Sequence, residues 1–222
     1  MRLHSTQQKF KDTELGALPI EWEIVKLGEL ASVIRGASPR PKGDSRYYGG
    51  NVPRLMVADV TRDGKYVTPI IDSLTKEGAK KSRFMKKGDI IIQVSGNPGT
   101  PCILNVDCCI HDGFSGLMDL KQDKIDSEFL FYYLTYVREK NSRLAFGSTF
   151  KNLQTYAIKK FKIQLPPLFE QKIISFVLST IQETQEKTEN VINSLKELKR
   201  SLMKHLFTYG TVLRVLKKKA IQ

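Results

Sequence analysis

The sequence predicts an α+β fold: one globular, strand-rich domain (residues 1–165), then a long coiled-coil-type helix (166–208) and a basic tail (209–222). Short segments of β-branched and aromatic residues, separated by turns rich in Gly, Pro and Asp, predict the strands. A seven-residue repeat of apolar positions after them predicts the helix. A length of 222 residues fits one domain with an extension.

The elements of the domain follow in order from these patterns. Residues 1–17 are polar and are expected to be poorly ordered. Strands are expected at 22–27, 52–60, 66–71, 90–94, 102–106, 114–120 and 157–165. Helical segments are expected at 28–31, at 75–82 after an N-cap at Ser73 or Thr75, and at 126–141 after Asp126 or Ser127. Irregular loops are expected at 35–50, at 95–101 and from Gly147 onward.

The junction at residues 165–171 marks the start of the long helix. Pro166 and Pro167 end a strand and open the helix, because proline fixes φ near the helical value and its missing N–H is no loss in a first turn. Glu170 then places a carboxylate where the helix dipole favours it. At ~1.5 Å per residue, a helix of about 38 residues is roughly 57 Å long.

A stripe of mostly apolar residues along this helix is expected to meet a second helix, because a compact domain at one end of the helix cannot cover it. Its positions, in two series that each repeat every seven residues, include Ile174, Leu178, Ile181, Gln185, Thr188, Ile192, Leu195, Leu202 and Leu206. The polar positions Gln185, Thr188 and Lys199 would fix the register of pairing, or are tolerated exposed defects.

The charge of the chain indicates a polyanionic partner. The formal net charge is +13, and residues 196–222 hold eight Lys and Arg against one Glu, a net of +7. That terminal run is either a solvated, disordered tail or part of a binding surface. Membrane phosphates are the competing polyanion, but no run of eighteen apolar residues exists and the N-terminus lacks a secretion signal, so a soluble cytoplasmic protein is expected.

Motifs of catalysis are missing from the sequence. It has no Gly-x-x-x-x-Gly-Lys-Ser/Thr loop, no Gly-x-Gly-x-x-Gly after a strand and no Asn/Asp-Pro-Pro-aromatic motif for holding a flipped base. Cys108, Cys109 and His111 lie close together, but adjacent residues on a strand face opposite ways and a fourth ligand is missing, so no metal site is expected. With three histidines and no apparent partner for Ser115 or Ser148, a triad is not expected either.

Two basic clusters are the candidate contacts to duplex DNA. Arginine can bind guanine or a phosphate with two hydrogen bonds, asparagine can do the same for adenine, and lysine suits phosphates. The candidate contacts are Arg35, Ser38, Arg40, Lys42, Arg46, Asn51, Arg54, Lys80, Lys81, Arg83, Asn97 and Lys151. Any one of them alone is better explained as a solvated surface residue, whereas the charge excess favours DNA for the group.

The order of several short motifs resembles the specificity (S) subunit of type I restriction–modification systems. The opening carries Thr-Glu-Leu-Gly-Ala-Leu-Pro-Ile-Glu-Trp-Glu at 13–23 and Arg-Gly-Ala-Ser-Pro-Arg-Pro at 35–41. The helix begins with Leu-Pro-Pro-Leu-Phe-Glu-Gln-Lys-Ile-Ile at 165–174 and ends with Leu-Phe-Thr-Tyr-Gly at 206–210. Each motif is short, and together they cover nearly the whole chain.

The resemblance implies a division of labour. An S subunit is not catalytic: its globular domain reads one half of a split DNA target, and its helices act as spacer and docking surface. Methyltransferase (M) subunits use S-adenosylmethionine, and a restriction (R) subunit uses ATP to cleave DNA. No cofactor is therefore expected on this chain, and S-adenosylmethionine, ATP and Mg²⁺ are expected on the partner subunits.

The chain departs from the S-subunit pattern of two recognition domains and two helices, because it has one of each. A half-subunit is expected, acting as a homodimer or with a second half-subunit through antiparallel helices. A two-fold axis would then read inverted half-sites. Two other hypotheses stay open. The chain is a scaffold protein with a basic surface and no sequence preference in DNA binding, or it is an accessory segment of a restriction enzyme whose catalytic part lies elsewhere.

Overall fold

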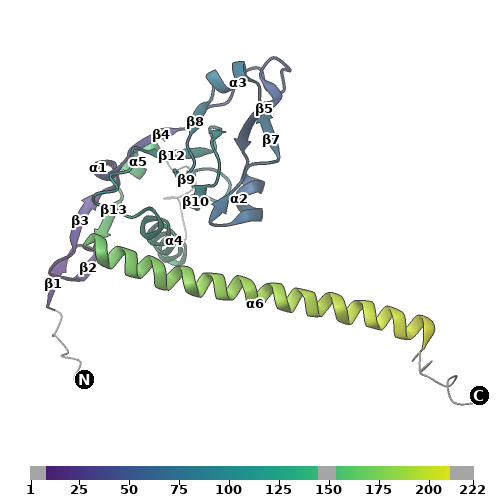
Figure 1. Cartoon of the computed structure of the whole chain (residues 1–222). Coiled ribbons are helices and arrows are strands. Elements are labelled where there is room, and N and C mark those ends of the chain that lie inside the picture. Colours follow the sequence, from purple (N-terminus) through teal and green to yellow (C-terminus); the bar gives the residue numbers. More distant parts are fainter. Residues whose placement is uncertain (1–8, 145–153, 211–222) are drawn as a thin grey trace, which may run out of the picture. The chain divides into compact units, whose positions relative to one another are not determined.

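The computed structural model describes residues 9–144 and 154–210, which fall into two units: a strand-rich unit up to Ser175 and a helical unit from Phe176 (Figure 1). The strands are β1 (Phe10–Thr13), β2 (Gly16–Pro19), β3 (Glu23–Lys26), β4 (Ser32–Arg35), β5 (Tyr48–Leu55), β6 (Tyr66–Val67), β7 (Asp72–Leu74), β8 (Arg83–Met85), β9 (Ile90–Gln93), β10 (Pro101–Leu104), β11 (Cys108–Ile110), β12 (Phe114–Met118) and β13 (Lys162–Leu165). The helices are α1 (Leu27–Leu30), α2 (Val57–Asp63), α3 (Lys76–Lys80), α4 (Ser127–Leu144), α5 (Thr155–Lys159) and α6 (Leu168–Tyr209). The predicted α+β class is confirmed.

Two mixed sheets build the strand-rich unit. One has the strand order β4-β12-β9-β10-β6 and the other the order β7-β5-β11-β8. The pairs β10–β6 and β11–β5 are parallel, and the other pairs in these sheets are antiparallel. Two small antiparallel pairs complete the unit: β1 with β2, and β3 with β13, which lie side by side in Figure 1.

Strand β9 separates the two hydrophobic clusters of the core. Ile90 and Ile92 belong to the cluster that includes residues of α1, α4 and β13, whereas Ile91 belongs to the cluster that includes residues of β5, β8 and β11. This follows from the period of a strand, in which successive side chains face opposite sides of the sheet. The strand with the three isoleucines is therefore covered on both faces, and the strand predicted at 90–94 is confirmed as β9.

The first turns of α6 belong to the strand-rich unit and are fixed there by buried polar contacts. The Gln171 side chain accepts a hydrogen bond from the Asp126 N–H (2.8 Å) and donates to the carbonyls of Lys124 (2.9 Å) and Pro166 (2.8 Å). The Ser175 hydroxyl donates to the Asp126 carboxylate at 2.9 Å. The same carboxylate accepts from the Phe129 N–H, so Asp126 also caps α4, as predicted.

From Phe176 onward, α6 exposes its apolar side chains. The whole helix has 42 residues and is therefore about 63 Å long. No residue of it beyond Ser175 is buried. Ile181 is 51% exposed and Leu195 is 58% exposed. No helix among the described residues has the length and hydropathy needed to cross a membrane.

Several expected elements differ from those observed. The expected strand at 52–60 ends at Leu55, and Val57–Asp63 form α2 because the buried Asp59 carboxylate accepts from the Met56 N–H at 3.0 Å and so caps the helix. The expected strand at 66–71 is only β6, since Pro69 has no N–H to offer a neighbour.

Two further expectations need correction at the ends of the strand-rich unit. Residues 10–17, expected to be poorly ordered, form the β1–β2 hairpin together with Leu18 and Pro19, and the turn of this hairpin uses Gly16 at a positive φ of 104°. The expected strand at 157–165 is divided into a helical turn, α5, and the shorter β13, which pairs with β3. The predicted strands also did not include β4, β7, β8 and β11.

Candidate nucleic-acid interface

The loop between β4 and β5, residues 36–47, carries four of the twelve predicted DNA contacts, Ser38, Arg40, Lys42 and Arg46, and is fixed at its base. The Gly36 N–H donates to the Phe114 carbonyl at 2.9 Å, and the Ala37 N–H donates to the Ile110 carbonyl at 3.1 Å. A Cβ at Gly36 would lie 2.0 Å from the His111 carbonyl oxygen, so only glycine allows this approach. The Ser82 hydroxyl also donates to the Ala37 carbonyl, at 2.7 Å.

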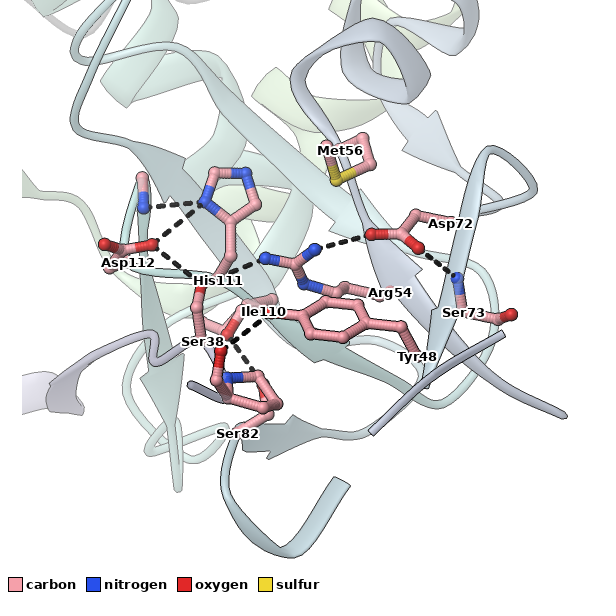
Figure 2. Close-up of polar contacts among 12 residues, drawn as sticks. Ser38, Tyr48, Arg54, Met56, Asp72, Ser73, Ser82, Ile110, His111 and Asp112 are labelled. Carbon is pink, nitrogen blue, oxygen red and sulfur yellow. Dashed lines mark hydrogen bonds and ion pairs between the residues drawn. The ribbon is translucent and has the colours of Figure 1, made fainter. Parts of the chain in front are cut away.

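A polar network joins the loop to three other segments (Figure 2). The Arg54 guanidinium of β5 donates to the Asp72 carboxylate of β7 at 2.5 Å and to the Ser38 hydroxyl at 2.9 Å. The Ser38 hydroxyl in turn donates to the Asp112 carboxylate at 2.9 Å. Arg54 therefore differs from the other predicted contacts, because its side chain is only 8% exposed.

Asp112, just beyond β11, connects this network to two exposed arginines. The Arg35 Nε donates to the Asp112 backbone carbonyl at 2.6 Å. The Arg40 guanidinium lies 4.0 Å from the Asp112 carboxylate, and its side chain is 74% exposed. The hydrogen bond from Ser38 is the first cause of a lowered pKa for Asp112, so this carboxylate is ionised at neutral pH.

The second half of the loop is held by α3. The Thr75 hydroxyl donates to the Arg46 carbonyl at 2.6 Å, and a Cβ at Gly78 would lie 2.1 Å from the Tyr47 carbonyl oxygen. Lys81 donates to the Tyr47 hydroxyl at 2.8 Å. Arg46 itself forms an exposed ion pair with Asp44 (2.6 Å), whose pKa is lowered to about 2 by hydrogen bonds from Arg46.

The structure brings most, but not all, of the predicted residues into one region. The exposed residues on the loop or on elements that contact it are Arg35, Arg40, Lys42, Arg46, Lys80, Lys81 and Arg83, the last of which lies opposite Ile110 in the β8–β11 pair. Ser38 is half-buried, and Asn51 is exposed at an irregularity of β5. Lys151 lies outside the described residues.

Asn97 lies in a separate loop that follows β9. Its side-chain oxygen accepts a hydrogen bond from Arg138 of α4 at 2.7 Å. The Val94 N–H at the start of this loop donates to the Gly113 carbonyl at 2.9 Å, which places the loop next to the 111–113 turn. Arg138 is therefore a further cation near the predicted site that the sequence did not single out.

His111 completes the buried side of the turn. Its Nδ1 accepts a hydrogen bond from the Gly113 N–H at 2.9 Å, and its ring packs edge-on against Phe114 at a centroid distance of 4.8 Å. Burial, reinforced by the charge of Arg54, lowers the pKa of His111, so the imidazole is neutral at pH 7. A neutral, enclosed ring that accepts a backbone hydrogen bond has a structural role in the turn.

The cysteines of β10 and β11 are buried in the core. Burial raises the pKa of Cys108 to about 12 and raises the pKa of Cys109, so both stay as thiols. Among the described residues, no group of three or more His, Cys, Asp and Glu side chains could hold a metal ion.

Sequence reasoning missed Asp72, Asp112 and Ser82, which position the loop. Tyr48 stacks under the Arg54 guanidinium at 5.3 Å, and its hydroxyl donates to the Pro39 carbonyl at 2.9 Å. The Arg54 partners lie 16 and 18 residues away in the chain, and Asp112 lies 74 residues from Ser38. Such contacts arise from strand order, and no local pattern signals them.

The family match and the similar proteins point to the same family. Residues 19–197 match the family described as the type I restriction modification DNA specificity domain. The chain is 31% identical over 203 residues to the putative type I restriction enzyme MjaX specificity subunit of Methanocaldococcus jannaschii, covering 90% of this chain and 46% of that protein. It is 25% identical over 202 residues to the EcoKI specificity subunit of Escherichia coli K12, covering 85% and 43%.

Solved structures give the same result for the fold. The HsdS subunit from Thermoanaerobacter tengcongensis superposes with a TM-score of 0.64 at 26% identity, covering 90% of this chain and 48% of that one. A chain from a structural study of type I R-M system assembly superposes with a TM-score of 0.66 at 27% identity, covering 87% and 47%. The chain spans about half the length of the curated relatives it matches.

Proposed function

The chain belongs to the type I restriction modification DNA specificity domain family, and we propose that it is the sequence-recognition part of a type I restriction–modification system. In this role the strand-rich unit reads one half of a bipartite target in duplex DNA. It is not itself catalytic. Family membership favours this role over a scaffold protein without sequence preference.

One observation carries the proposal beyond the family: exposed cations surround a loop whose backbone is held in place. Arg35 and Arg40 both lie against Asp112, and Lys81 lies against Tyr47 at the other end of the loop. Contacts to phosphates give affinity, whereas reading of bases needs side chains at fixed positions. A disordered basic loop would supply only the first.

The helical unit supports a second part of the proposal, which is pairing with another α6 helix. The stripe residues Ile181, Ile192, Leu195 and Leu202 are between 39% and 58% exposed. An antiparallel partner, either a second copy of this chain or another half-length subunit, would cover them. Two copies would have a two-fold axis and would read inverted half-sites separated by a spacer.

The remaining partners follow from the role. A methyltransferase subunit that binds S-adenosylmethionine and a restriction subunit that uses ATP and Mg²⁺ would dock on this chain, which itself would bind none of these cofactors. The assembly would act on DNA in the cytoplasm. The exposed Lys and Arg of the interface are the groups expected to face DNA, while the long helix offers the docking surface.

A binding experiment with matched variants tests the proposal. The full chain, with its cognate methyltransferase subunit, is used to enrich duplexes from a random library, and methylated adenines are then mapped. Enrichment of one split sequence, methylated at fixed positions, is expected. A library that stays random, with no site-specific methylation, would contradict the proposal.

Charge-removal variants locate the interface. Arg40→Ala/Lys42→Ala removes two exposed cations of the loop, and Lys121→Ala/Lys124→Ala removes two exposed cations elsewhere. If the loop contacts two phosphates, the first variant should reduce the slope of log K against log salt by about 2, and the second should leave it unchanged. Equal effects of the two variants would mean that binding depends on net charge alone.

A further inference from the structure

Arg54 is a buried cation at the centre of the candidate interface, with its guanidinium directed into the protein. Its two terminal nitrogens donate to Asp72 and Ser38, at 2.5 and 2.9 Å, and the guanidinium carbon lies 5.3 Å from the centroid of the Tyr48 ring. Its Nε is buried and has no hydrogen-bond partner among the described residues. With 8% of its side chain exposed, Arg54 has little surface to offer to DNA.

The contacts of Arg54 lead to two exposed arginines, Arg35 at the end of β4 and Arg40 in the loop. Ser38 receives the hydrogen bond from Arg54 and passes one on to Asp112 at 2.9 Å. Asp112 in turn accepts from Arg35 through its carbonyl and lies 4.0 Å from Arg40. Figure 2 shows the part of this series that runs from Asp72 through Arg54 and Ser38 to Asp112.

The chemistry of the pair favours a geometric role. A buried ion pair contributes little net stability, because desolvation of both charges offsets their attraction. A guanidinium can donate to two partners in fixed directions, whereas an ammonium is a single point of charge on a flexible stem. The arrangement needs that property, since Asp72 and Ser38 belong to segments that are far apart in the sequence.

We propose that Arg54 is a positioning residue for DNA reading: it holds Ser38, and through Asp112 also Arg35 and Arg40, in the arrangement that discriminates between sequences, without contacting DNA itself. The link to DNA rests on the proposed function, while the positioning of the loop does not. The two parts can therefore be tested separately.

Hydrogen exchange tests the positioning without DNA. The amides of Gly36 and Ala37 report on the base of the loop, because both are hydrogen-bonded to neighbouring strands. Arg54→Lys keeps the charge but loses the planar guanidinium that donates to two partners in fixed directions. These amides should therefore exchange about tenfold faster, which is the effect of losing one hydrogen bond to a charged group. Ser38→Ala removes the other end of the link, keeps the Arg54–Asp72 pair and should have the same effect.

Arg62→Lys is the matched control for exchange. Arg62 also donates to two carboxylates, Asp59 at 3.0 Å and Asp63 at 2.5 Å, but it lies on α2, and its further hydrogen bond goes to the Thr68 carbonyl (2.8 Å), outside the loop. Its replacement should leave the Gly36 and Ala37 amides unchanged. Unchanged exchange in both Arg54→Lys and Ser38→Ala, or equal acceleration in Arg62→Lys, would overturn the positioning of the loop by Arg54. If Arg54→Lys does not fold, Ser38→Ala decides the question.

Binding measurements then test the role in reading DNA. The probes are a duplex enriched by the wild-type chain from a random library and a scrambled duplex of the same composition. In Arg54→Lys, the Kd for the scrambled duplex divided by the Kd for the enriched duplex should fall about tenfold. The slope of log K against log salt should stay that of the wild type. In Arg54→Gln, which removes the charge, a slope smaller by about one would show a direct phosphate contact, and in Arg54→Lys an unchanged ratio would show that the loop arrangement does not matter; either result would overturn the proposal. If the wild-type chain enriches no sequence, the proposed function fails, and the exchange result still decides the positioning.

Discussion

The strand-rich unit and the helical unit that begins at Phe176 place similar side chains in opposite environments. Ile91 and Leu117 are at most 1% exposed in the first unit, whereas Ile181 and Leu195 are 51% and 58% exposed in the second. Fully burying one such side chain contributes roughly 1.5–3 kcal/mol. The first unit gains this stabilisation within its own fold, whereas the second can gain it only from a partner, which we propose is another helix.

The strongest test of this difference is a charge in the apolar stripe. Leu195→Asp should weaken self-association of the chain at least about a hundredfold, because two leucines lose roughly 1.5–3 kcal/mol each in a symmetric pair. Sedimentation equilibrium measures the change. Unfolding of the strand-rich unit should stay as in the wild type.

Asn190→Asp is the matched control for the stripe. It adds the same charge to the same helix, five residues earlier and therefore about 140° away around the helix axis. Self-association should be unchanged. A wild-type chain that stays monomeric at micromolar concentration, or equal effects of both variants, would rule out the stripe as the pairing surface.

A pair of phenylalanines tests the other side of the comparison. Phe114 is fully buried and Phe207 is 86% exposed. Phe114→Ala should lower the free energy of unfolding by about 3–5 kcal/mol, and Phe207→Ala should change it by less than about 0.5 kcal/mol. Fluorescence of Trp22, the single tryptophan, follows unfolding of the strand-rich unit in urea. A similar cost for both variants would mean that Phe207 is covered in solution.

Two glutamines on one helix sharpen the boundary between the units. Gln171 is fully buried and satisfies three backbone groups, whereas Gln185 is exposed. Gln171→Leu should destabilise the strand-rich unit by about 2–4 kcal/mol, because the groups left unpaired stay buried. Gln185→Leu should leave the stability of that unit unchanged and strengthen self-association. If Gln185→Leu destabilised the strand-rich unit and Gln171→Leu did not, the boundary between the two units would lie elsewhere in α6.

The long helix could be predicted from the sequence because its signals are local. Pro166 and Pro167 precede it, and the seven-residue repeat continues through Leu206. The run of isoleucines from Ile90 to Ile92 likewise predicted a strand, which the structure confirms as β9. The prediction of a strand after Leu55 was wrong for a related reason. Val57 and Val60 suit a strand, but the Asp59 carboxylate caps a helix there.

The candidate site could be predicted only as a list of residue types. The loop and its basic residues are visible in the sequence, and the family resemblance gave their function. The burial of Arg54 is not visible, because an arginine near glycines and tyrosines has the same local pattern whether it faces water or a carboxylate. Only the β5–β7 pairing, which sets Arg54 opposite Asp72, distinguishes the two cases.

The smallest expected effect concerns pH and the turn beside the loop. The pKa of His111 is lowered in the folded protein by burial and by Arg54, with Asp112 and Asp72 acting in the opposite direction. The unfolded chain therefore binds a proton at His111 more readily, so stability is full above a pH of about 6.5 and is lost as pH falls below it. Protonation would also place a donor at Nδ1 against the Gly113 N–H.

His111→Asn tests this directly, because the asparagine oxygen can take the place of Nδ1 as an acceptor without titrating in this range. The urea midpoint of the wild type, followed by Trp22 fluorescence, should be lower at pH 5.5 than at pH 7.5, and the difference should shrink in His111→Asn. His205→Asn, a change of the same kind in the helical unit, should keep the wild-type difference. If His111→Asn retained the full pH dependence, the acid sensitivity of the strand-rich unit would have to come from carboxylates, and the 111–113 turn would not contribute to it.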